Sequence, residues 1–583
     1  MQTPLLQIDQ LVLDFVSDGK VSNALKNINI SVSKGEILAI VGESGSGKSI
    51  SSLSILQLLP SPPAIYRSGK ILFTPGSDTV DLLQQSPAAM QKIRGNRIAM
   101  IFQEPMTSLN PVFTCGFQVV EAIRQHQPVS EAEAKEKTLH LFRQTQLPDP
   151  ERMFSSYPHQ LSGGQKQRVM IAMAMSCEPD LLICDEPTTA LDVTVQKSIL
   201  QLIRDLQKET QMGVIFITHD LSVVADLADT VAVMYQGELV EKNTAEALFR
   251  HPQHPYTKAL LACRPLLHKK GDRLPVVADF MVTTGTATDI PFPSLQTGPV
   301  TQEFTAIKNT SAQKKEVLVS VQNLKVYFPG GKSFFGKTRQ YTKAVDDVSF
   351  ELYTGETLGL VGESGCGKTT LGRSLLRLVE KTSGRILYKG LDLGEVAPAT
   401  LRSLRKEMQL IFQDPYSSLN PRIQVGDAIA EPMLVQGLYA NQKERSQKVR
   451  ELLDKVGLLP EHYHRYPHEF SGGQRQRIVI ARALALSPSL IICDESVSAL
   501  DVSVQAQILN LLNDLKKEFG FTAVFISHDL SVVRYISDRI LVMNKGRIEE
   551  SGEAEDLFMN PQSAYTQRLI SSIPGNSRLR YAQ

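Results

Sequence analysis

The chain contains the same series of sequence motifs twice, in the same order. The paired segments are 42–49 and 362–369, 101–111 and 411–421, 162–168 and 471–477, 181–187 and 490–496, and 218–224 and 527–533. Lys48 and Lys368 are 320 positions apart, whereas Asp185 and Asp494 are 309 apart. The second copy is therefore shorter than the first between its P-loop lysine and the later motifs, and those later motifs keep a constant spacing. Register kept over so many motifs indicates a duplicated domain of about 270 residues, not a short solenoid repeat.

The segment between the two copies differs in composition from both. Residues 281–312 are rich in Thr, Gly and Pro, carry only three charged side chains and show no helical period. This pattern favours a flexible linker, although an extended strap packed on a domain surface is the alternative. We therefore predict a first domain over 1–270, a linker over 271–316 and a second domain over 317–583.

Composition excludes several classes of protein. With 42% hydrophobic and 21% charged residues the chain is globular, and its net charge of +1 gives no overall field that would attract nucleic acid or an anionic membrane. No apolar run reaches the roughly 18 residues that a membrane span needs. The first positive charge is Lys20, so the start does not resemble a secretory signal. The six cysteines form no C-x-x-C pair, which argues against a zinc site and favours a reducing, cytoplasmic compartment.

Within each copy, strand and helix patterns alternate. The apolar run at 36–41 predicts a strand before a Gly-rich loop, residues 49–59 predict a helix, and the run at 213–218 predicts a buried strand. Four residues recur at helical spacing, namely Val195, Ile199, Leu202 and Leu206. The stretch 112–175 lacks strand patterns and is predicted to be a helical subdomain. Alternation of this kind indicates an α/β domain with a parallel sheet.

The Gly-rich loop of each copy has the form G-x-x-x-x-G-K-[ST] between a strand and a helix, which is the P-loop of nucleotide-binding proteins. Its backbone N–H groups and the start of the following helix wrap a phosphate chain. The predicted nucleotide-binding residues are Gly42, Ser44, Gly45, Gly47, Lys48, Ser49 and Ile50 in the first copy, and Gly362, Ser364, Gly365, Gly367, Lys368, Thr369 and Thr370 in the second. The lysines would reach the β- and γ-phosphates. The hydroxyls of Ser49 and Thr369 would bind Mg²⁺.

Two acidic residues follow a run of four apolar residues in each copy. Asp185 and Asp494 would end a buried strand beside Mg²⁺, and Glu186 and Glu495 would act as general bases or as carboxylates that orient the water. Two solvated acids after a core strand are the alternative.

A histidine and a glutamine recur at matching places. His219 and His528 follow a strand pattern and are assigned to the γ-phosphate, although a lone histidine there is usually a core or capping residue. Gln103 and Gln413 follow Ile-Phe and are assigned to the nucleotide and to Mg²⁺ on this context alone.

A second Gly-rich motif completes the set. LSGGQ at 161–165 and FSGGQ at 470–474, together with both P-loops, resemble the signature of the ATP-binding cassette (ABC) family. The resemblance covers nearly the whole chain outside the linker. It implies two P-loop NTPase domains, each with a RecA-like α/β core, a helical signature subdomain and an antiparallel β portion.

The resemblance also implies how ATP is bound and hydrolysed. The two cassettes would pair head to tail within one chain, so no homodimer is required. The signature residues Ser162, Gly163, Gly164 and Gln165 would complete the site of Lys368, and Ser471, Gly472, Gly473 and Gln474 would complete the site of Lys48. The family also stacks an aromatic ring on adenine. Alignment nominates Phe15 and Phe328, with core packing as an equal explanation and Tyr341 as a competitor in the second copy.

Both predicted sites retain every catalytic group, so the chain is predicted to be an ATPase with two hydrolytic sites, using ATP and Mg²⁺. The segments at 251–262 and 560–574, and the SLNP sequence after each glutamine, resemble the oligopeptide and dipeptide importer branch. That branch implies two integral-membrane permease subunits as partners, an extracytoplasmic binding protein as an indirect one, and a peripheral place on the cytoplasmic face of the inner membrane. A single Cys263 after the first segment supports no iron–sulfur role.

The cargo stays open, because it never contacts this subunit. Peptides lead, and glutathione, peptide antibiotics, nickel chelates and sugar oligomers are alternatives. A ribosome-associated tandem cassette is disfavoured by the nearly uncharged linker, so no nucleic-acid partner is expected. A DNA-repair cassette is disfavoured by the lack of sustained heptads.

Overall fold

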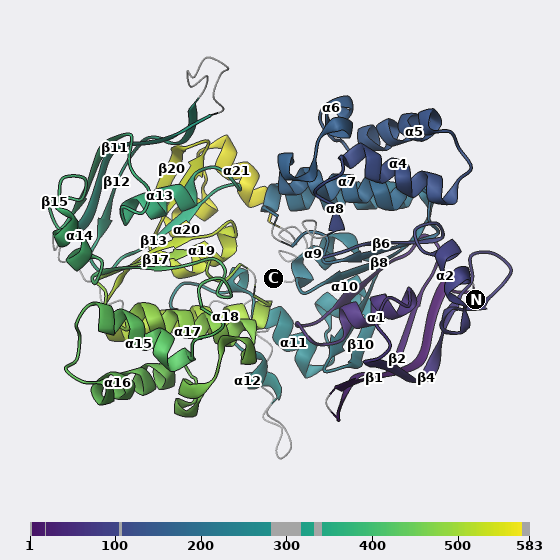
Figure 1. The fold of residues 1–583 in the computed structure, drawn as a ribbon, viewed down its shortest axis with the longest axis horizontal. Coiled ribbons are helices and arrows are strands. Elements are labelled where there is room, and N and C mark those ends of the chain that lie inside the picture. Colours follow the sequence, from purple (N-terminus) through teal and green to yellow (C-terminus); the bar gives the residue numbers. More distant parts are fainter. Residues whose placement is uncertain are drawn as a thin grey trace, which may run out of the picture. The chain divides into compact units, whose positions relative to one another are not determined.

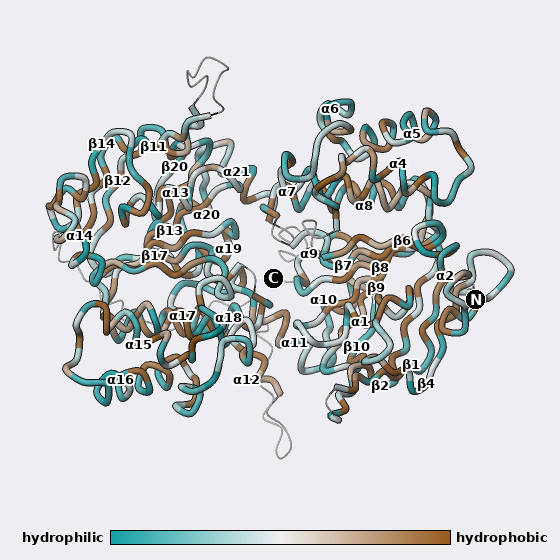
Figure 2. Tube along the Cα trace, in the orientation of Figure 1, coloured by the Kyte–Doolittle hydropathy of each residue, from teal (hydrophilic) through white to brown (hydrophobic). Residues whose placement is uncertain are grey.

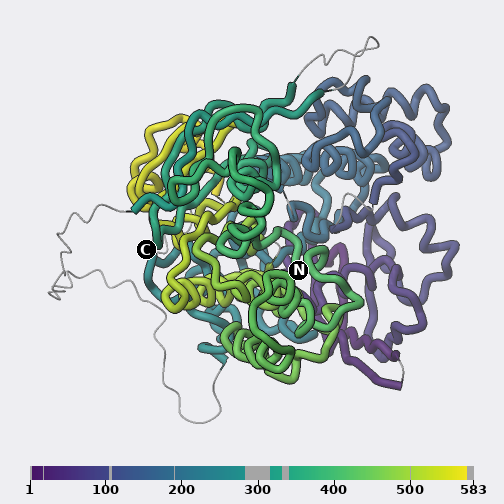
Figure 3. The backbone as a smooth tube through the Cα atoms, turned by 60° about the vertical axis from the view of Figure 1, so that its left-hand side comes forward, coloured from purple at the N-terminus to yellow at the C-terminus, as the bar shows by residue number. Residues whose placement is uncertain are grey.

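The computed structural model describes residues 3–17, 19–103, 108–189, 191–281, 316–330, 341–498 and 500–573. These residues form two compact units. The first holds the described residues up to Leu261 together with 277–281, and the second holds 262–276 together with those from 316 to 573. Figure 1 labels the elements of both units, and Figure 3 shows the same backbone from another side. Each unit carries one of the two motif series.

The first unit is built on two sheets. The larger one has the strand order β10-β9-β3-β8-β7-β6, in which every neighbouring pair is parallel except β9 and β10. The smaller one is antiparallel, with the order β2-β1-β4-β5. The strands are β1 (Leu6–Ser17), β2 (Lys20–Val32), β3 (Ile37–Val41), β4 (Ala64–Phe73), β5 (Val80–Asp81), β6 (Ile98–Ile101), β7 (Leu181–Asp185), β8 (Gly213–Thr218), β9 (Thr230–Tyr235) and β10 (Glu238–Thr244).

Helices cover the first unit's larger sheet, and four of them, α4 to α7, form a lobe of their own (Figure 1). The α-helices are α1 (Lys48–Ile55), α2 (Pro87–Ile93), α4 (Cys115–His126), α5 (Glu131–Gln144), α6 (Pro150–Ser155), α7 (Gly163–Met175), α8 (Val193–Thr210), α9 (Leu221–Leu227), α10 (Ala245–Arg250), α11 (Pro255–Ala262) and α12 (Val277–Met281). Three short 3₁₀ turns are η1 (Leu82–Gln84), η2 (Pro158–Gln160) and η3 (Pro265–Leu267), the last of which belongs to the second unit.

The second unit repeats this plan, with sheet orders β16-β17-β18-β13-β19-β20 and β12-β11-β14-β15. Its strands are β11 (Val317–Pro329), β12 (Tyr341–Tyr353), β13 (Thr357–Val361), β14 (Ser383–Tyr388), β15 (Leu391–Asp392), β16 (Met408–Ile411), β17 (Leu490–Asp494), β18 (Thr522–Ile526), β19 (Arg539–Asn544) and β20 (Arg547–Glu553). Its helices are α13 (Lys368–Leu375), α14 (Pro398–Leu404), α15 (Val425–Val435), α16 (Gln442–Lys455), η4 (Pro460–His464), η5 (Pro467–Glu469), α17 (Gly472–Leu484), α18 (Val502–Phe519), α19 (Leu530–Ile536), α20 (Ala554–Met559) and α21 (Ala564–Ser571).

The parallel strands β3, β7 and β8 of the larger sheet are buried on both faces, as their unbroken apolar runs require. Along β3, Ile37, Ala39 and Val41 face a core shared with the helical lobe. Leu38 and Ile40 face a second core shared with the antiparallel sheet. This alternation is the period-two pattern of a strand, and Figure 2 shows the hydrophobic residues concentrated on these strands. The α/β fold, the parallel strands and the helical subdomain over 112–175 are as predicted.

The predicted helix over 49–59 is too long. Helix α1 ends at Ile55, because Gln57 adopts a positive φ of 49° and Pro60 follows soon after.

The connecting segment differs from the prediction where the structure describes it. Residues 262–276, which include the start of the predicted 271–316 linker, belong to the second unit, and residues 277–281 form α12 of the first. The rest of the predicted linker, 282–315, lies outside the described residues. Among the described helices, none combines the length and apolar character that crossing a bilayer requires.

Candidate nucleotide site

The P-loop of each unit connects the central strand to a helix. In the first unit it joins β3 to α1, and Gly47 begins the helix from a left-handed conformation with φ 101°. A Cβ on Gly42 would collide with the carbonyl oxygen of Met234, which explains the need for glycine there. The Nζ of Lys48 donates to the carbonyls of Gly42 and Glu43 at 2.8 and 2.9 Å. The amine is thus held over the loop, where the backbone wraps an anion.

The second P-loop has the same geometry, but the residue before its last glycine differs in chemistry. Lys368 donates to the carbonyls of Gly362 and Glu363 at 2.8 and 3.0 Å. Cys366 stands where the first loop has Ser46, and its Sγ lies 3.9 Å from the lysine Nζ. The hydroxyl of Ser46 is buried and has no hydrogen-bond partner among the residues that the structure describes, and burial raises the pKa of the Cys366 thiol.

Each P-loop hydroxyl contacts the aspartate that ends a buried strand. Ser49 Oγ donates to Asp185 Oδ1 at 3.0 Å, and Thr369 Oγ1 donates to Asp494 Oδ1 at 2.9 Å. Burial raises the pKa of Asp185 to about 6, although the Ser49 hydrogen bond opposes this. Burial likewise raises the pKa of Asp494, which Arg373 partly offsets at 3.9 Å. A buried carboxylate beside a hydroxyl is a set of hard oxygen donors that fits Mg²⁺.

The glutamates are held in an unusual backbone conformation. Glu186 and Glu495 have φ values of 47° and 49°, in the left-handed region that side chains rarely adopt. Their N–H groups donate to the carbonyls of Ile217 and Ile526, at 3.0 and 2.9 Å, which fixes the turn against the neighbouring strand. Strain of this kind is concentrated at functional sites, because the fold must maintain it.

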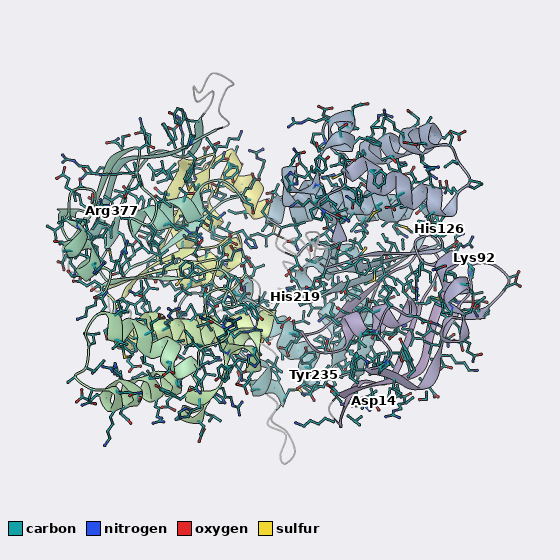
Figure 4. All side chains as sticks on the ribbon, in the orientation of Figure 1. Asp14, Lys92, His126, His219, Tyr235 and Arg377 are labelled. Atoms are coloured by element: carbon teal, nitrogen blue, oxygen red, sulfur yellow. The ribbon has the colours of Figure 1, made fainter. Side chains whose placement is uncertain are left out.

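The predicted histidine and glutamine of each unit both contact the side-chain carboxylate of its glutamate. Gln103 Nε2 donates to Glu186 Oε2 at 3.1 Å, and His219 Nδ1 lies 3.2 Å from the same oxygen. Figure 4 labels His219. In the second unit Gln413 donates to Glu495 Oε2 at 2.9 Å and His528 Nδ1 lies 3.5 Å away.

These contacts decide the charge of the glutamates. Burial alone would raise the pKa of Glu186, but the hydrogen bond and charge of His219, with the charge of Lys48, lower it to about 2. The pKa of Glu495 is also lowered, since His528 and Lys368 outweigh burial. Desolvation lowers the pKa of His528, but the hydrogen bond to Glu495 and the charges of Glu495 and Asp529 together outweigh it and raise the pKa. Both glutamates are therefore carboxylates at neutral pH, as a general base must be.

The signature motifs lie at the start of a helix in each unit. Ser162 caps α7: its Oγ accepts from Gln165 N at 3.4 Å, and Gln165 Oε1 accepts from Ser162 N at 2.9 Å. Ser471 and Gln474 form the same capping box on α17. A Cβ on Gly164 would lie 2.6 Å from Val195 Cγ1, so the second glycine lets α7 approach α8 closely. The first and second glycines leave the N-terminus of the helix open to an anion.

Several predicted residues lie outside this cluster. Ile50 packs against the first unit's core at the start of α1, and Thr370 takes the matching position in α13. Phe15 also packs against that core, whereas Phe328 and Tyr341 are 42% and 56% exposed. The choice between adenine stacking and core packing for these aromatics stays a prediction.

Sequence reasoning missed a tyrosine that reaches each P-loop. The hydroxyl of Tyr256, on α11, accepts from Glu43 N at 3.0 Å, and that of Tyr565, on α21, accepts from Glu363 N at 3.1 Å. Tyr256 is fully buried and its ring packs on Tyr235 at 4.3 Å. The signal was present, because the two tyrosines are separated by the same 309 positions as the other motifs.

The two sites also differ in a contact that the motifs do not show. Thr189 Oγ1 donates to Glu186 Oε2 at 3.0 Å. Its counterpart Ser498 instead donates to the backbone carbonyl of Glu495 at 2.9 Å.

Comparison with known proteins agrees with this geometry. The ABC transporter family matches residues 25–189 and 345–498, which include both P-loops and both acidic pairs. The chain belongs to the ABC transporter family. A second family, described as the C-terminal region of oligopeptide/dipeptide transporters, matches residues 240–282 and 550–581. The tyrosine contacts to the P-loops thus come from a segment characteristic of this branch of ABC transporters.

Relatives cover nearly the whole chain. The glutathione import ATP-binding protein GsiA of Escherichia coli O157:H7 is 50% identical over 576 residues, which are 98% of this chain and 89% of that protein. GsiA of Shigella sonnei (strain Ss046) is similar to the same extent. A solved dimeric bacterial ABC transporter cassette is 26% identical, covering 40% of this chain and 98% of that one, with a TM-score of 0.37. The chain is a fused tandem ABC ATPase, the ATP-binding subunit of an importer.

Proposed function

We propose that this chain powers the import of glutathione or short peptides, by binding and hydrolysing two ATP molecules between its two halves. The observation that carries the proposal is the complete set of catalytic groups in both units of a chain that is half identical to glutathione importers over nearly its full length. The match to the C-terminal region of oligopeptide/dipeptide transporters, after both cassettes, supports a peptide-like cargo.

The residues of each P-loop bind the phosphates of one nucleotide. Lys48 and Lys368 provide the cation for the β- and γ-phosphates, while the loop N–H groups and the start of α1 or α13 bind the remaining phosphate oxygens. Ser49 with Asp185, and Thr369 with Asp494, would hold Mg²⁺, and Gln103 and Gln413 would be further oxygen ligands of it. When bound, Mg²⁺ neutralises charge on the phosphate oxygens.

Glu186 and Glu495 act as general bases toward the attacking water. Each is ionised at neutral pH by its histidine and its P-loop lysine. His219 and His528 hold the carboxylate in place and contact the γ-phosphate. In each unit the glutamine donates to the carboxylate oxygen that the histidine also contacts. Gln103 and Gln413 thereby couple the glutamate to the segment that leads into the helical lobe.

Each nucleotide is bound by the P-loop of one unit and is then contacted by the signature motif of the other unit. Ser162 and the start of α7 close over the ATP of Lys368, and Ser471 with α17 closes over the ATP of Lys48. The γ-phosphate is the anion that these helix N-termini bind, so closure requires ATP and ends with hydrolysis.

Two integral-membrane permease subunits receive this motion, and an extracytoplasmic binding protein delivers the cargo to them. The chain works at the cytoplasmic face of the membrane. In the second unit, a cavity of about 260 Å³ lies between β16 and the helices α15 and α17, next to the segment that carries Gln413. Its lining is largely apolar, including Leu376, Leu378, Met408, Phe412 and Val479. We assign this cavity, which we call the groove, to apolar side chains of a permease helix.

Reconstitution tests the proposal. The chain is co-purified with its permease subunits, placed in lipid vesicles and supplied with the matching binding protein. We expect ATP hydrolysis to rise when the binding protein carries glutathione or a short peptide, and radiolabelled cargo to accumulate. Stimulation by a nickel chelate or an oligosaccharide alone would assign a different cargo to the same ATPase. Salt-sensitive ribosome association without permease binding would overturn the transport function.

A further inference from the structure

The segment that follows the first cassette, residues 262–276, is built into the second unit. Cys263 and Leu274 are 0% and 1% exposed and belong to the second unit's main core, against which Leu266 also packs. The turn η3 lies against α19. We call residues 262–276 the strap. Burial of several apolar side chains is what distinguishes an integral element from a passive linker.

An asparagine binds the backbone of the strap in both directions. Asn510, on α18, accepts from Leu274 N at 3.0 Å through Oδ1, and donates from Nδ2 to Leu274 O at 2.8 Å. Asn510 is only 5% exposed. A buried side-chain amide that pairs with both the N–H and the C=O of one residue fixes a single register, because any shift would leave buried polar groups without partners.

Further contacts extend along the strap. Tyr535, on α19 and 1% exposed, donates its hydroxyl to Asp272 O at 2.7 Å. At the strap's surface Arg273 pairs with Asp514 at 2.9 Å, and Lys270 pairs with Asp538. The opposed charges favour this orientation of the strap, but exposed pairs of this kind contribute little to affinity.

The side chains that bind the strap have no equivalents at the matching positions of the first unit. At the register offset of 309, the counterpart of Asn510 is Gln201, which is exposed and donates to Asp205 at 2.7 Å, and the counterpart of Tyr535 is Asp226. The two side chains that bind the strap's backbone are thus absent from the first unit's equivalent positions. Their presence in the second unit is not a general property of the cassette.

We propose that the surface formed by α18 and α19 is a peptide-docking site whose resident ligand is the strap, and that this docking keeps the two halves of the chain together when no nucleotide is bound. The strap follows α11 of the first unit directly, so its anchorage holds the halves independently of ATP. This role goes beyond ATP-driven closure, which would hold the halves only while the γ-phosphate is present.

Cleavage of the full-length chain tests the proposal. A specific protease site replaces residues 294–300, downstream of the strap, and the cut protein is run on size exclusion in EDTA without nucleotide. We expect the two fragments to elute together, and to stay together at about 0.5 M salt, because the buried contacts are screened far less than surface pairs. The Leu274→Asp/Asn510→Ala double variant should separate. The matched Gln201→Ala variant should behave as the parent.

Two results would overturn the proposal: separation of the cut parent fragments, or co-elution of the cut double variant. A milder variant guards against misfolding of the double variant. In Tyr535→Phe, amide exchange of residues 272–276 should be about fivefold faster, as the loss of one hydrogen bond predicts, while the affinity for ATP stays unchanged. Exchange equal to that of the parent would mean that Tyr535 does not hold the strap.

Discussion

At the scale of single residues, Glu186 and Glu495 combine a left-handed backbone with a side chain that is charged despite burial. Both features come from neighbours: a strand carbonyl fixes the turn, and a histidine and a lysine stabilise the carboxylate. A glutamine at the same position keeps the size and the hydrogen bonds but cannot take a proton.

We expect Glu186→Gln and Glu495→Gln each to lower ATP hydrolysis to a similar extent, at least twofold, and the double variant to lose roughly 10²- to 10⁴-fold, as the loss of a general base predicts. Steady-state phosphate release measures this. ATP affinity, measured by equilibrium binding, should be retained and serves as the control. Full activity in one single variant and none in the other would show that the two sites are not equivalent.

Asp185 gives a prediction about stability and pH. Its pKa is about 6 in the folded, nucleotide-free protein, above the usual 3.8. The ionised carboxylate therefore destabilises the fold above pH 6, and this cost disappears as the pH falls toward 4. Asp185→Asn should raise the free energy of unfolding by roughly 2 to 3 kcal/mol at pH 8, and the gain should shrink below pH 6.

Thermal unfolding at pH 4.5 and pH 8, without nucleotide, measures the effect of Asp185→Asn. Asp494→Asn is the matched control and should gain less, because Arg373 already offsets that carboxylate. A gain that does not vary with pH would contradict the assignment.

At the scale of secondary-structure elements, α11 and α21 connect the oligopeptide-type segments to the P-loops through one hydroxyl each. Tyr256→Phe removes the acceptor of the Glu43 N–H group and should weaken ATP binding about fivefold, in line with about 1 kcal/mol for a hydrogen bond. Tyr235→Phe keeps the ring that packs on Tyr256 and should leave ATP affinity unchanged. Fluorescent-nucleotide titration compares the two, and equal affinities would contradict a positioning role for Tyr256.

The groove beside β16 gives a second prediction for an element. Phe412 is 42% exposed and lines the groove, so Phe412→Asp should abolish co-purification with the permeases while leaving ATP binding intact. Leu391→Asp places the same charge at a residue of β15 that is 49% exposed and lies outside the groove. Loss of the permeases with both variants would show a general effect of charge rather than docking in the groove.

Sequence periodicity predicted the strands and helices whose formation depends mainly on residues close together in the chain. The strand over 213–218 agrees with β8, and the helical subdomain over 112–175 agrees with α4 to α7. The clustering of Gln103, Glu186 and His219 was also predictable, because parallel strands end at one edge of a sheet. The end of α1 was not predicted, since Gln57 has no sequence signal for its positive φ. The pairing of Leu274 with Asn510 joins residues 236 positions apart and leaves no periodicity to detect.

At the scale of the whole molecule, the proposed head-to-tail arrangement makes a prediction about pairs of variants. Lys48→Ala and Ser471→Arg would damage the same ATP site, so their combined effect on hydrolysis should be no larger than that of the more severe single variant. Lys48→Ala and Ser162→Arg would damage different sites, and their combination should abolish hydrolysis. Contacting residues couple in such cycles, whereas independent ones add.

Phosphate release from the three single variants and both pairs is the measurement. If Lys48 coupled to Ser162 instead of Ser471, each nucleotide would be completed by its own half. Folding of each variant is checked by its melting temperature.

The strap has a consequence for how such a gene can change. Although the coding sequence reads as one module followed by its duplicate, a stretch encoded with the first copy completes the hydrophobic interior of the second. Fission of the gene at the repeat boundary would therefore yield two polypeptides that depend on each other, because the tail of the first would still have to fill the interior of the second beside Asn510 and Tyr535. The two copies are duplicates by descent but no longer interchangeable parts.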